Sequence, residues 1–209
     1  MNHRCSMLLV AASVALISVS STFAQSPGAS PTQPSSPSNP GMSPSAGTSP
    51  ASMPSSTDAN AGASADKSFV KKALQGGIAE VQLGQLALQK SSNPEVKQFA
   101  QKMVDDHTKL GDQMKPVAEQ MGVKVPDSPS PKDKSTMTKL QALNGDAFDK
   151  AYIKDMVKDH QQDEKDFKQE AQSATNPQLK QVASQGEQVI SEHLQMIQQI
   201  AQKNNVASK

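Results

Sequence analysis

Apolar residues recur at alternating spacings of three and four positions from residue 68 to residue 203. That spacing places them along one face of an α-helix, as a seam that packs against a partner helix. The seams are interrupted at the NP dipeptides that begin at Asn93 and Asn176, and at the GVKVPDSPSPKD stretch that begins at Gly122. Asn caps a helix and Pro suits its first turn. The pattern therefore predicts four long helices, at residues 68–90, 94–121, 146–173 and 177–203, and a short one at 135–143.

Each of the four long seams contains one polar residue near its middle. In the first helix the seam residues are Phe69, Ala73, Gly76, Glu80, Leu83 and Ala87. The polar residues of the four seams are Glu80, His107, His160 and His193. Within each hairpin the two polar residues lie at nearly equal distances from the NP turn, so an antiparallel hairpin should bring them level. Joining the hairpins by a long crossover predicts an all-α, antiparallel four-helix bundle that gathers all four side chains in its interior.

These four side chains have the chemistry of a metal site. Burying a carboxylate and three imidazoles without partners costs several kcal/mol, on the order of 2 or more for each group. A divalent transition metal, Fe, Mn, Zn or Cu, would satisfy them directly. Asp163 and Glu164 follow His160 by three and four residues, so they share its face and are further candidate ligands. The alternative is an architectural polar layer, in which Glu80 and Asp163 hydrogen-bond the histidines and fix the register of the bundle.

Other polar residues beside the histidines are expected outside this site. Asp106, Asp159 and Glu192 each directly precede a histidine, which places them about 100° around the helix. We expect them at the edge of a seam or in solvent. Gly76 and Gly77 interrupt the first helix, and we expect them to permit close packing of a neighbouring helix. The sequence contains no motif of a hydrolase and no glycine-rich phosphate loop, so an enzyme is less expected than a binding protein.

The N-terminal third of the chain predicts export. Residues 1–24 have the pattern of a secretory signal peptide, with Arg4 before an apolar run and cleavage expected after Ala24. Removing it also removes Cys5, the one cysteine, and leaves no segment apolar enough to span a membrane. Residues 25–65 are rich in Ser, Pro, Ala and Gly, which predicts a disordered linker before a bundle at residues 66–205. The expected location is the periplasm or cell envelope of a bacterium.

The charge of the exported chain argues against a nucleic-acid partner. The whole chain has Lys+Arg 21 and Asp+Glu 20, so the loss of Arg4, its sole arginine, leaves 20 against 20. A neutral chain with no arginine, one Tyr and no Trp lacks the basic field and the stacking rings that nucleic acids require.

Four stretches of the sequence, in their order along the chain, resemble those of a known protein family. The stretches are AEVQLGQLAL, NPEVKQFAQKMVDDHTKL, NGDAFDKAYIKDMVKDH and EHLQMIQQIAQK. They resemble the exported bacterial proteins of the DUF4142 family, a domain of unknown function often labelled "predicted outer membrane protein". The resemblance implies a ferritin-like four-helix fold and export, but no activity.

The ferritin-like pattern also suggests what kind of metal site to expect. That pattern has a Glu on each of two helices and a Glu-x-x-His on each of the other two. Glu80 matches its first Glu, and His107 and His193 match its histidines. Val104 and Ile190 stand where the bridging glutamates would be, and His160 stands where the other Glu would be. These departures from the pattern favour a single-metal, histidine-rich site over a di-iron ferroxidase centre.

Three functions follow as hypotheses. The first is an exported protein that binds one transition metal through Glu80 and the three histidines, for metal buffering or envelope stress protection. The second is a structural or interaction module of the cell envelope with a purely architectural polar layer. The third is a metal-dependent redox enzyme, which requires an open coordination position.

Overall fold

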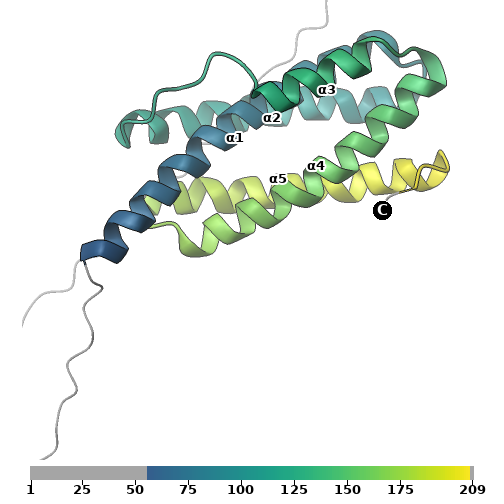
Figure 1. Cartoon of the computed structure of the whole chain (residues 1–209). Coiled ribbons are helices and arrows are strands. Elements are labelled where there is room, and N and C mark those ends of the chain that lie inside the picture. Colours follow the sequence, from purple (N-terminus) through teal and green to yellow (C-terminus); the bar gives the residue numbers. More distant parts are fainter. Residues whose placement is uncertain (1–55, 208–209) are drawn as a thin grey trace, which may run out of the picture. The chain divides into compact units, whose positions relative to one another are not determined.

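The computed structural model describes residues 56–207, which contain five α-helices (Figure 1). They are α1 (Ser56–Lys90), α2 (Pro94–Gln120), α3 (Pro131–Gln141), α4 (Gly145–Ser173) and α5 (Pro177–Lys203). The predicted signal peptide and residues 25–55 of the predicted linker lie outside the described residues. Among the described residues, no helix combines the length and the hydropathy that a membrane span requires.

The two NP dipeptides begin helices in the way that the sequence predicts. Asn93 caps α2, because its side-chain oxygen accepts hydrogen bonds from the backbone N–H groups of Glu95 and Val96. Asn176 caps α5 in the same way. Both turns therefore close tight hairpins, α1 with α2 and α4 with α5.

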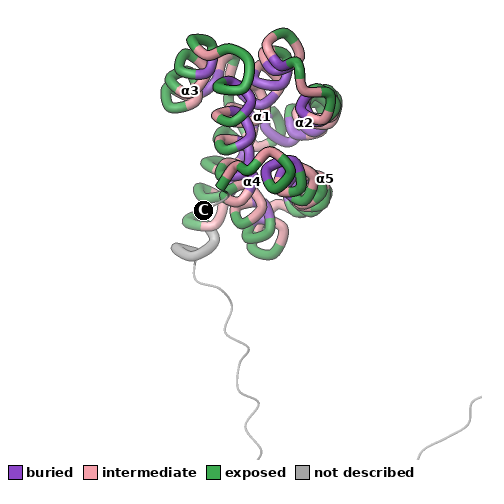
Figure 2. Tube along the Cα trace, turned by 90° about the vertical axis from the view of Figure 1, so that its right-hand side faces the viewer, coloured by how far each residue is buried: buried purple, intermediate pink, exposed green. Residues whose placement is uncertain are grey.

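The two hairpins pack on each other as a ferritin-like four-helix bundle (Figure 2). In the end-on view α1 and α2 form one layer and α4 and α5 the other, with α2 against α5 and α1 against α4. The long crossover contains α3, which lies outside the four-helix core against α1 and α4. The fold predicted from the seams is thus confirmed, with the short helix beginning four residues earlier, at Pro131.

The apolar core consists of two clusters at different heights in the bundle. One is built around Phe99, Tyr152 and Ile197, and the other around Leu110, Phe167 and Leu179. On every long helix of the core the polar seam residue falls between the members of the two clusters, as Glu80 does between Leu74 and Leu83. The bundle therefore has a polar layer, Glu80 with the three histidines, between two apolar regions.

The start of α1 is the main difference from the sequence prediction. The helix begins at Ser56 rather than residue 68, so residues 56–65 of the predicted linker are helical. Alternating alanines from Ala59 to Ala65 favour a helix. Because alanine adds no clear apolar seam and the stretch has the composition of a linker, the pattern did not predict this part of the helix. The seam of this helix also differs, because Val70 and Leu74 are buried whereas Phe69 and Ala73 are only partly buried.

Candidate metal centre

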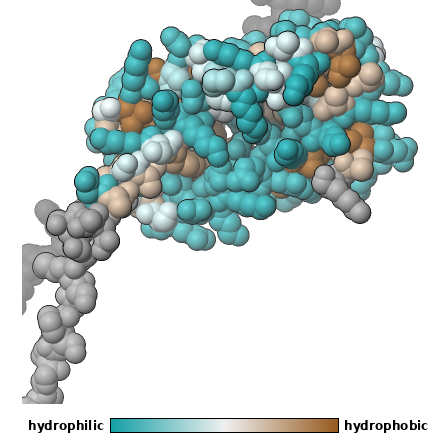
Figure 3. Space-filling view, in the orientation of Figure 1, coloured by the Kyte–Doolittle hydropathy of each residue, from teal (hydrophilic) through white to brown (hydrophobic). Residues whose placement is uncertain are grey.

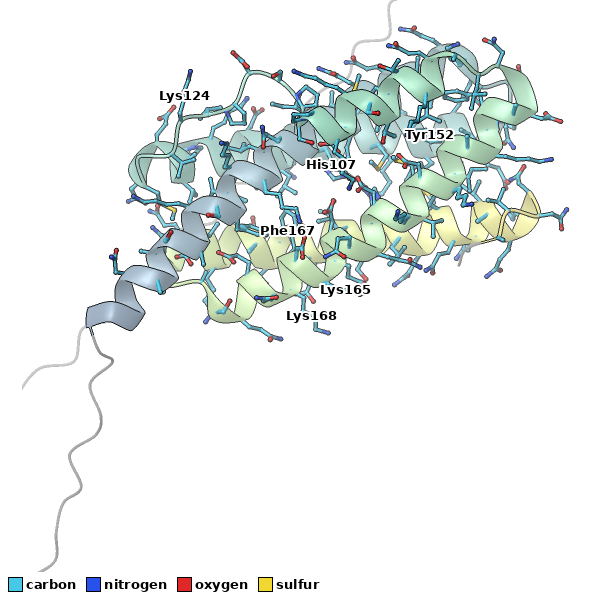
Figure 4. All side chains as sticks on the ribbon, in the orientation of Figure 1. His107, Lys124, Tyr152, Lys165, Phe167 and Lys168 are labelled. Atoms are coloured by element: carbon cyan, nitrogen blue, oxygen red, sulfur yellow. The ribbon has the colours of Figure 1, made fainter. Side chains whose placement is uncertain are left out.

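The polar layer brings the four predicted side chains together from four helices. Glu80 of α1 and His107 of α2 are 2% and 3% exposed, and His160 of α4 and His193 of α5 are fully buried. The centroids of the three imidazole rings are 5.2 to 5.8 Å apart. One ring nitrogen of each histidine lies within 4.8 Å of one from each of the others. Figure 4 shows His107 between the two hairpins, in the interior of the bundle.

Each histidine uses one ring nitrogen to contact an acceptor of the protein. The contacts are His107 Nδ1 to Glu80 Oε2 at 2.9 Å, His160 Nδ1 to the Met156 carbonyl at 3.0 Å, and His193 Nε2 to Asp106 Oδ2 at 2.8 Å. A carbonyl oxygen or an ionised carboxylate only accepts, so when Glu80 and Asp106 are ionised the proton of each neutral ring lies on the contacting nitrogen. The other nitrogen of each ring then carries a lone pair.

Those lone pairs have no partner among the described residues. They lie on His107 Nε2, His160 Nε2 and His193 Nδ1, and Glu80 Oε1 is likewise buried without a hydrogen bond. With Glu80 ionised, none of these four atoms carries a hydrogen, so they cannot hydrogen-bond to one another. A divalent cation satisfies all of them at once, and a metal-binding histidine typically donates its other N–H to a carboxylate or a carbonyl. The donor set therefore fits a transition metal.

Burial sets the protonation of the layer. Desolvation lowers the pKa of His107 and of His193 to about 4. Desolvation and the neighbouring imidazoles lower the pKa of His160 well below its ordinary value. All three rings are therefore neutral at pH 7, the form that binds a metal. Desolvation raises the pKa of Glu80 well above its ordinary value, so a nearby cation would be needed to hold it as a carboxylate.

A second group of carboxylates meets at Glu80. One oxygen of each of Glu80, Asp159 and Asp163 lies within 4.8 Å of the others. Asp163 is a residue that the sequence singles out, and burial followed by the nearby Glu80 raises its pKa to about 8. Glu164, the other acidic candidate on α4, is half-buried and belongs to neither this group nor the histidine group.

Two residues that the sequence places at a seam edge or in solvent instead lie next to members of the site. Asp106 is partly exposed but contacts His193 on a different helix, and Asp159 is half-buried next to Glu80 and Asp163. The residue before a histidine lies about 100° from it around the same helix. That angle does not say which side chains a neighbouring helix places at the same point. Asp106 lies where α2 faces α5, and that position allows His193 to reach it.

A cavity of about 120 Å³ borders the site. Glu80, His107, Asp159 and Asp163 line it, together with Gly76 and Gly77 of α1. A Cβ atom added at either glycine would meet no atom within 4 Å, so these glycines do not serve the close packing that the sequence suggested. Gly84 has that role, because a Cβ there would lie 2.9 Å from the Ala100 carbonyl oxygen of α2. The face drawn in Figure 3 is mostly hydrophilic and is hollowed near its centre.

The fold and the site define a ferritin-like helical bundle with a histidine-rich polar layer. The chain belongs to the DUF4142 family, a domain of unknown function, whose model matches residues 51–200. It is also similar in structure to a DUF305 protein from Streptomyces coelicolor that is described as secreted. That likeness has a TM-score of 0.59 at 14% identity and covers 68% of this chain and 94% of the other. A search of curated proteins finds no match.

Proposed function

We propose that this domain is an exported metal-binding protein that holds one transition-metal ion in the bundle core. The observation that carries the proposal is the arrangement of the three imidazoles. Each directs one N–H to a protein acceptor and leaves its other nitrogen buried and unpartnered beside the other two. The Met156 carbonyl and Asp106 fix the tautomers of His160 and His193 before a metal arrives, and Glu80 fixes that of His107 once it is ionised.

The donor types restrict the metal to a borderline ion. Three neutral imidazoles and one carboxylate suit Zn²⁺, Cu²⁺ or Fe²⁺ better than Mg²⁺ or Ca²⁺, which prefer oxygen. His107, His160 and His193 would be ligands, and Glu80 Oε1 would complete the set, since it lies 3.8 Å from His160 Nε2. Asp106 and the Met156 carbonyl would orient two of the rings.

The proposed role is metal buffering or protection of the cell envelope from stress. The predicted signal peptide and the secreted DUF305 protein of similar fold both support a location outside the cytoplasm. A fully buried ligand set favours retention of an ion over rapid turnover. A binding protein is therefore the function that the residues support best.

Metal analysis of the chain from Gln25, produced without a polyhistidine tag, tests this proposal. The protein is incubated separately with Zn²⁺, Cu²⁺ and Fe²⁺, desalted, and analysed for bound metal. We expect about one equivalent of at least one ion in the unmodified chain and none in His107→Ala or His193→Ala, because a three-ligand core is lost with any member.

The matched control is Met103→Leu. Met103 is fully buried one turn before His107, and its role as core filler predicts that the variant keeps its metal. A folded, unmodified chain that retains none of the three ions would contradict metal binding. It would favour the architectural polar layer instead.

A further inference from the structure

Glu80 links the histidine group to a second, all-oxygen group. Its Oε2 accepts from His107, and its carboxylate also lies with those of Asp159 and Asp163 within 4.8 Å. Asp159 and Asp163 are one helical turn apart on α4, so both reach the same face of that helix. One buried residue therefore contributes to two neighbouring sets of potential ligands.

The carboxylate group contains a buried oxygen that the fold leaves unpartnered. Glu80 is 2% exposed, and its Oε1 has no hydrogen bond within the described part of the chain. Neither Glu80 nor Asp163 forms an ion pair with a lysine among these residues, and Lys132 Nζ lies 4.0 Å from Asp159 Oδ1. Among the described residues Lys132 is thus the one lysine that pairs with a member of this group, and Glu80 and Asp163 have no lysine partner.

The cavity gives a cation room at this point. Gly76 and Gly77 precede Glu80 by four and three residues, so they lie on its face of α1 and leave the space above it open. A water molecule needs about 10–15 Å³ of such space, so a cavity of about 120 Å³ holds a cation with a few waters. A hard divalent ion that keeps part of its hydration shell suits such a space.

We propose that Glu80, Asp159 and Asp163 form a second cation site, for a hard divalent ion of the Mn²⁺, Mg²⁺ and Ca²⁺ class, beside the histidine site. Carboxylate and water oxygens are the ligands that these ions prefer, whereas the imidazoles select a softer ion. Glu80 is shared between the two sites, and its Oε1, the oxygen that does not contact His107, would bridge the two ions. This inference builds on the proposed function, and it makes the bundle core a centre of two unlike metals.

Manganese titration of the chain from Gln25, first loaded with Zn²⁺ at the histidine site, tests the second site. The electron paramagnetic resonance signal of free Mn²⁺ measures binding, and zinc is quantified in the same samples. We expect one equivalent of Mn²⁺ in the unmodified chain. Asp163→Asn and Asp159→Asn should bind it about tenfold or more weakly with zinc unchanged, because each replaces a charged ligand by a neutral one. Competition with Mg²⁺ and Ca²⁺ then ranks the members of the class.

The matched control is Asp166→Asn. Asp166 lines the same cavity but pairs with Lys72, and it is absent from the ligand group. We expect this variant to bind Mn²⁺ as the unmodified chain does. Equal binding in Asp163→Asn, or zinc retention without any manganese binding, would overturn the second site alone. Manganese binding that depends on the aspartates in a chain that takes none of Zn²⁺, Cu²⁺ and Fe²⁺ would instead overturn the histidine site.

Discussion

Helix α1 buries two carboxylates to the same extent, but the two differ in how many hydrogen bonds they accept. Asp66 and Glu80 are each 2% exposed. Asp66 Oδ2 accepts three hydrogen bonds from the α4–α5 turn, two from Thr175 at 3.0 and 2.6 Å and one from the Asn176 N–H at 3.0 Å. Glu80 has one such contact, to His107, and its Oε1 has none among the described residues.

This difference separates an architectural polar group from a candidate ligand. A buried polar group that only supports a fold is normally satisfied within that fold. Asp66 meets this expectation, because it fastens the N-terminal part of α1 to the far turn of the other hairpin. The layer around Glu80 does not meet it, because four of the seven buried side-chain atoms without partners among the described residues, one carboxylate oxygen and three imidazole nitrogens, belong to it. Each such atom costs about 1–3 kcal/mol unless something binds it.

The largest expected effect is the loss of metal-dependent stability in His160→Leu. In the unmodified chain a metal at 100 times its dissociation constant should raise the free energy of unfolding by about 2.7 kcal/mol. The variant should gain nothing, because its ligand set is broken. Urea unfolding with and without Zn²⁺ measures both values.

Asp66→Asn is the control for that experiment. Asp66 lies outside the layer, so this variant should keep the full zinc-dependent increment. An increment in His160→Leu equal to that of the unmodified chain would place the bound metal elsewhere.

The second expected effect concerns the architectural carboxylate. Asp66→Ala removes the acceptor of three hydrogen bonds, so the free energy of unfolding should fall by about 1–3 kcal/mol. Metal binding should not change. Urea unfolding and metal analysis of the same variant test the two statements, and a loss of bound metal would remove the distinction between the two carboxylates.

The third effect is a gain in stability, whereas the second is a loss. In the absence of metal, His160→Leu should raise the free energy of unfolding by about 1 kcal/mol, because an apolar side chain of similar size replaces a buried ring with an unpartnered nitrogen. Chelator-treated samples in urea provide the measurement. A metal-free variant that is clearly less stable than the unmodified chain would indicate that His160 supports the fold in its own right.

The fold and the polar layer were predictable because both depend on local patterns. Seam spacing gave the helices, and equal distances from the NP turns put Glu80 level with His107 and His160 level with His193. The contacts that sequence reasoning missed join different hairpins. Asp106 lies 87 residues from His193, and Asp66 lies 109 residues from Thr175. Such contacts depend on how one hairpin is rotated against the other, and no periodicity encodes that rotation.

The last expected effect is a pH dependence at the Asp66 end of the bundle. Glu170 lies beside Asp66, and burial, together with that neighbouring carboxylate, raises the pKa of Glu170 from 4.5 to about 7. Between these values the folded chain binds more protons than the unfolded chain, so this contribution to stability is complete below pH 4.5 and is lost as pH rises to about 7.

The variant Glu170→Gln cannot titrate at this position. The difference in unfolding free energy, metal-free unmodified chain minus variant, should therefore fall across this window and level off above it. Urea unfolding at a series of pH values measures the difference, and a constant value from pH 4.5 to 7 would show that neither burial nor Asp66 perturbs the ionisation of Glu170.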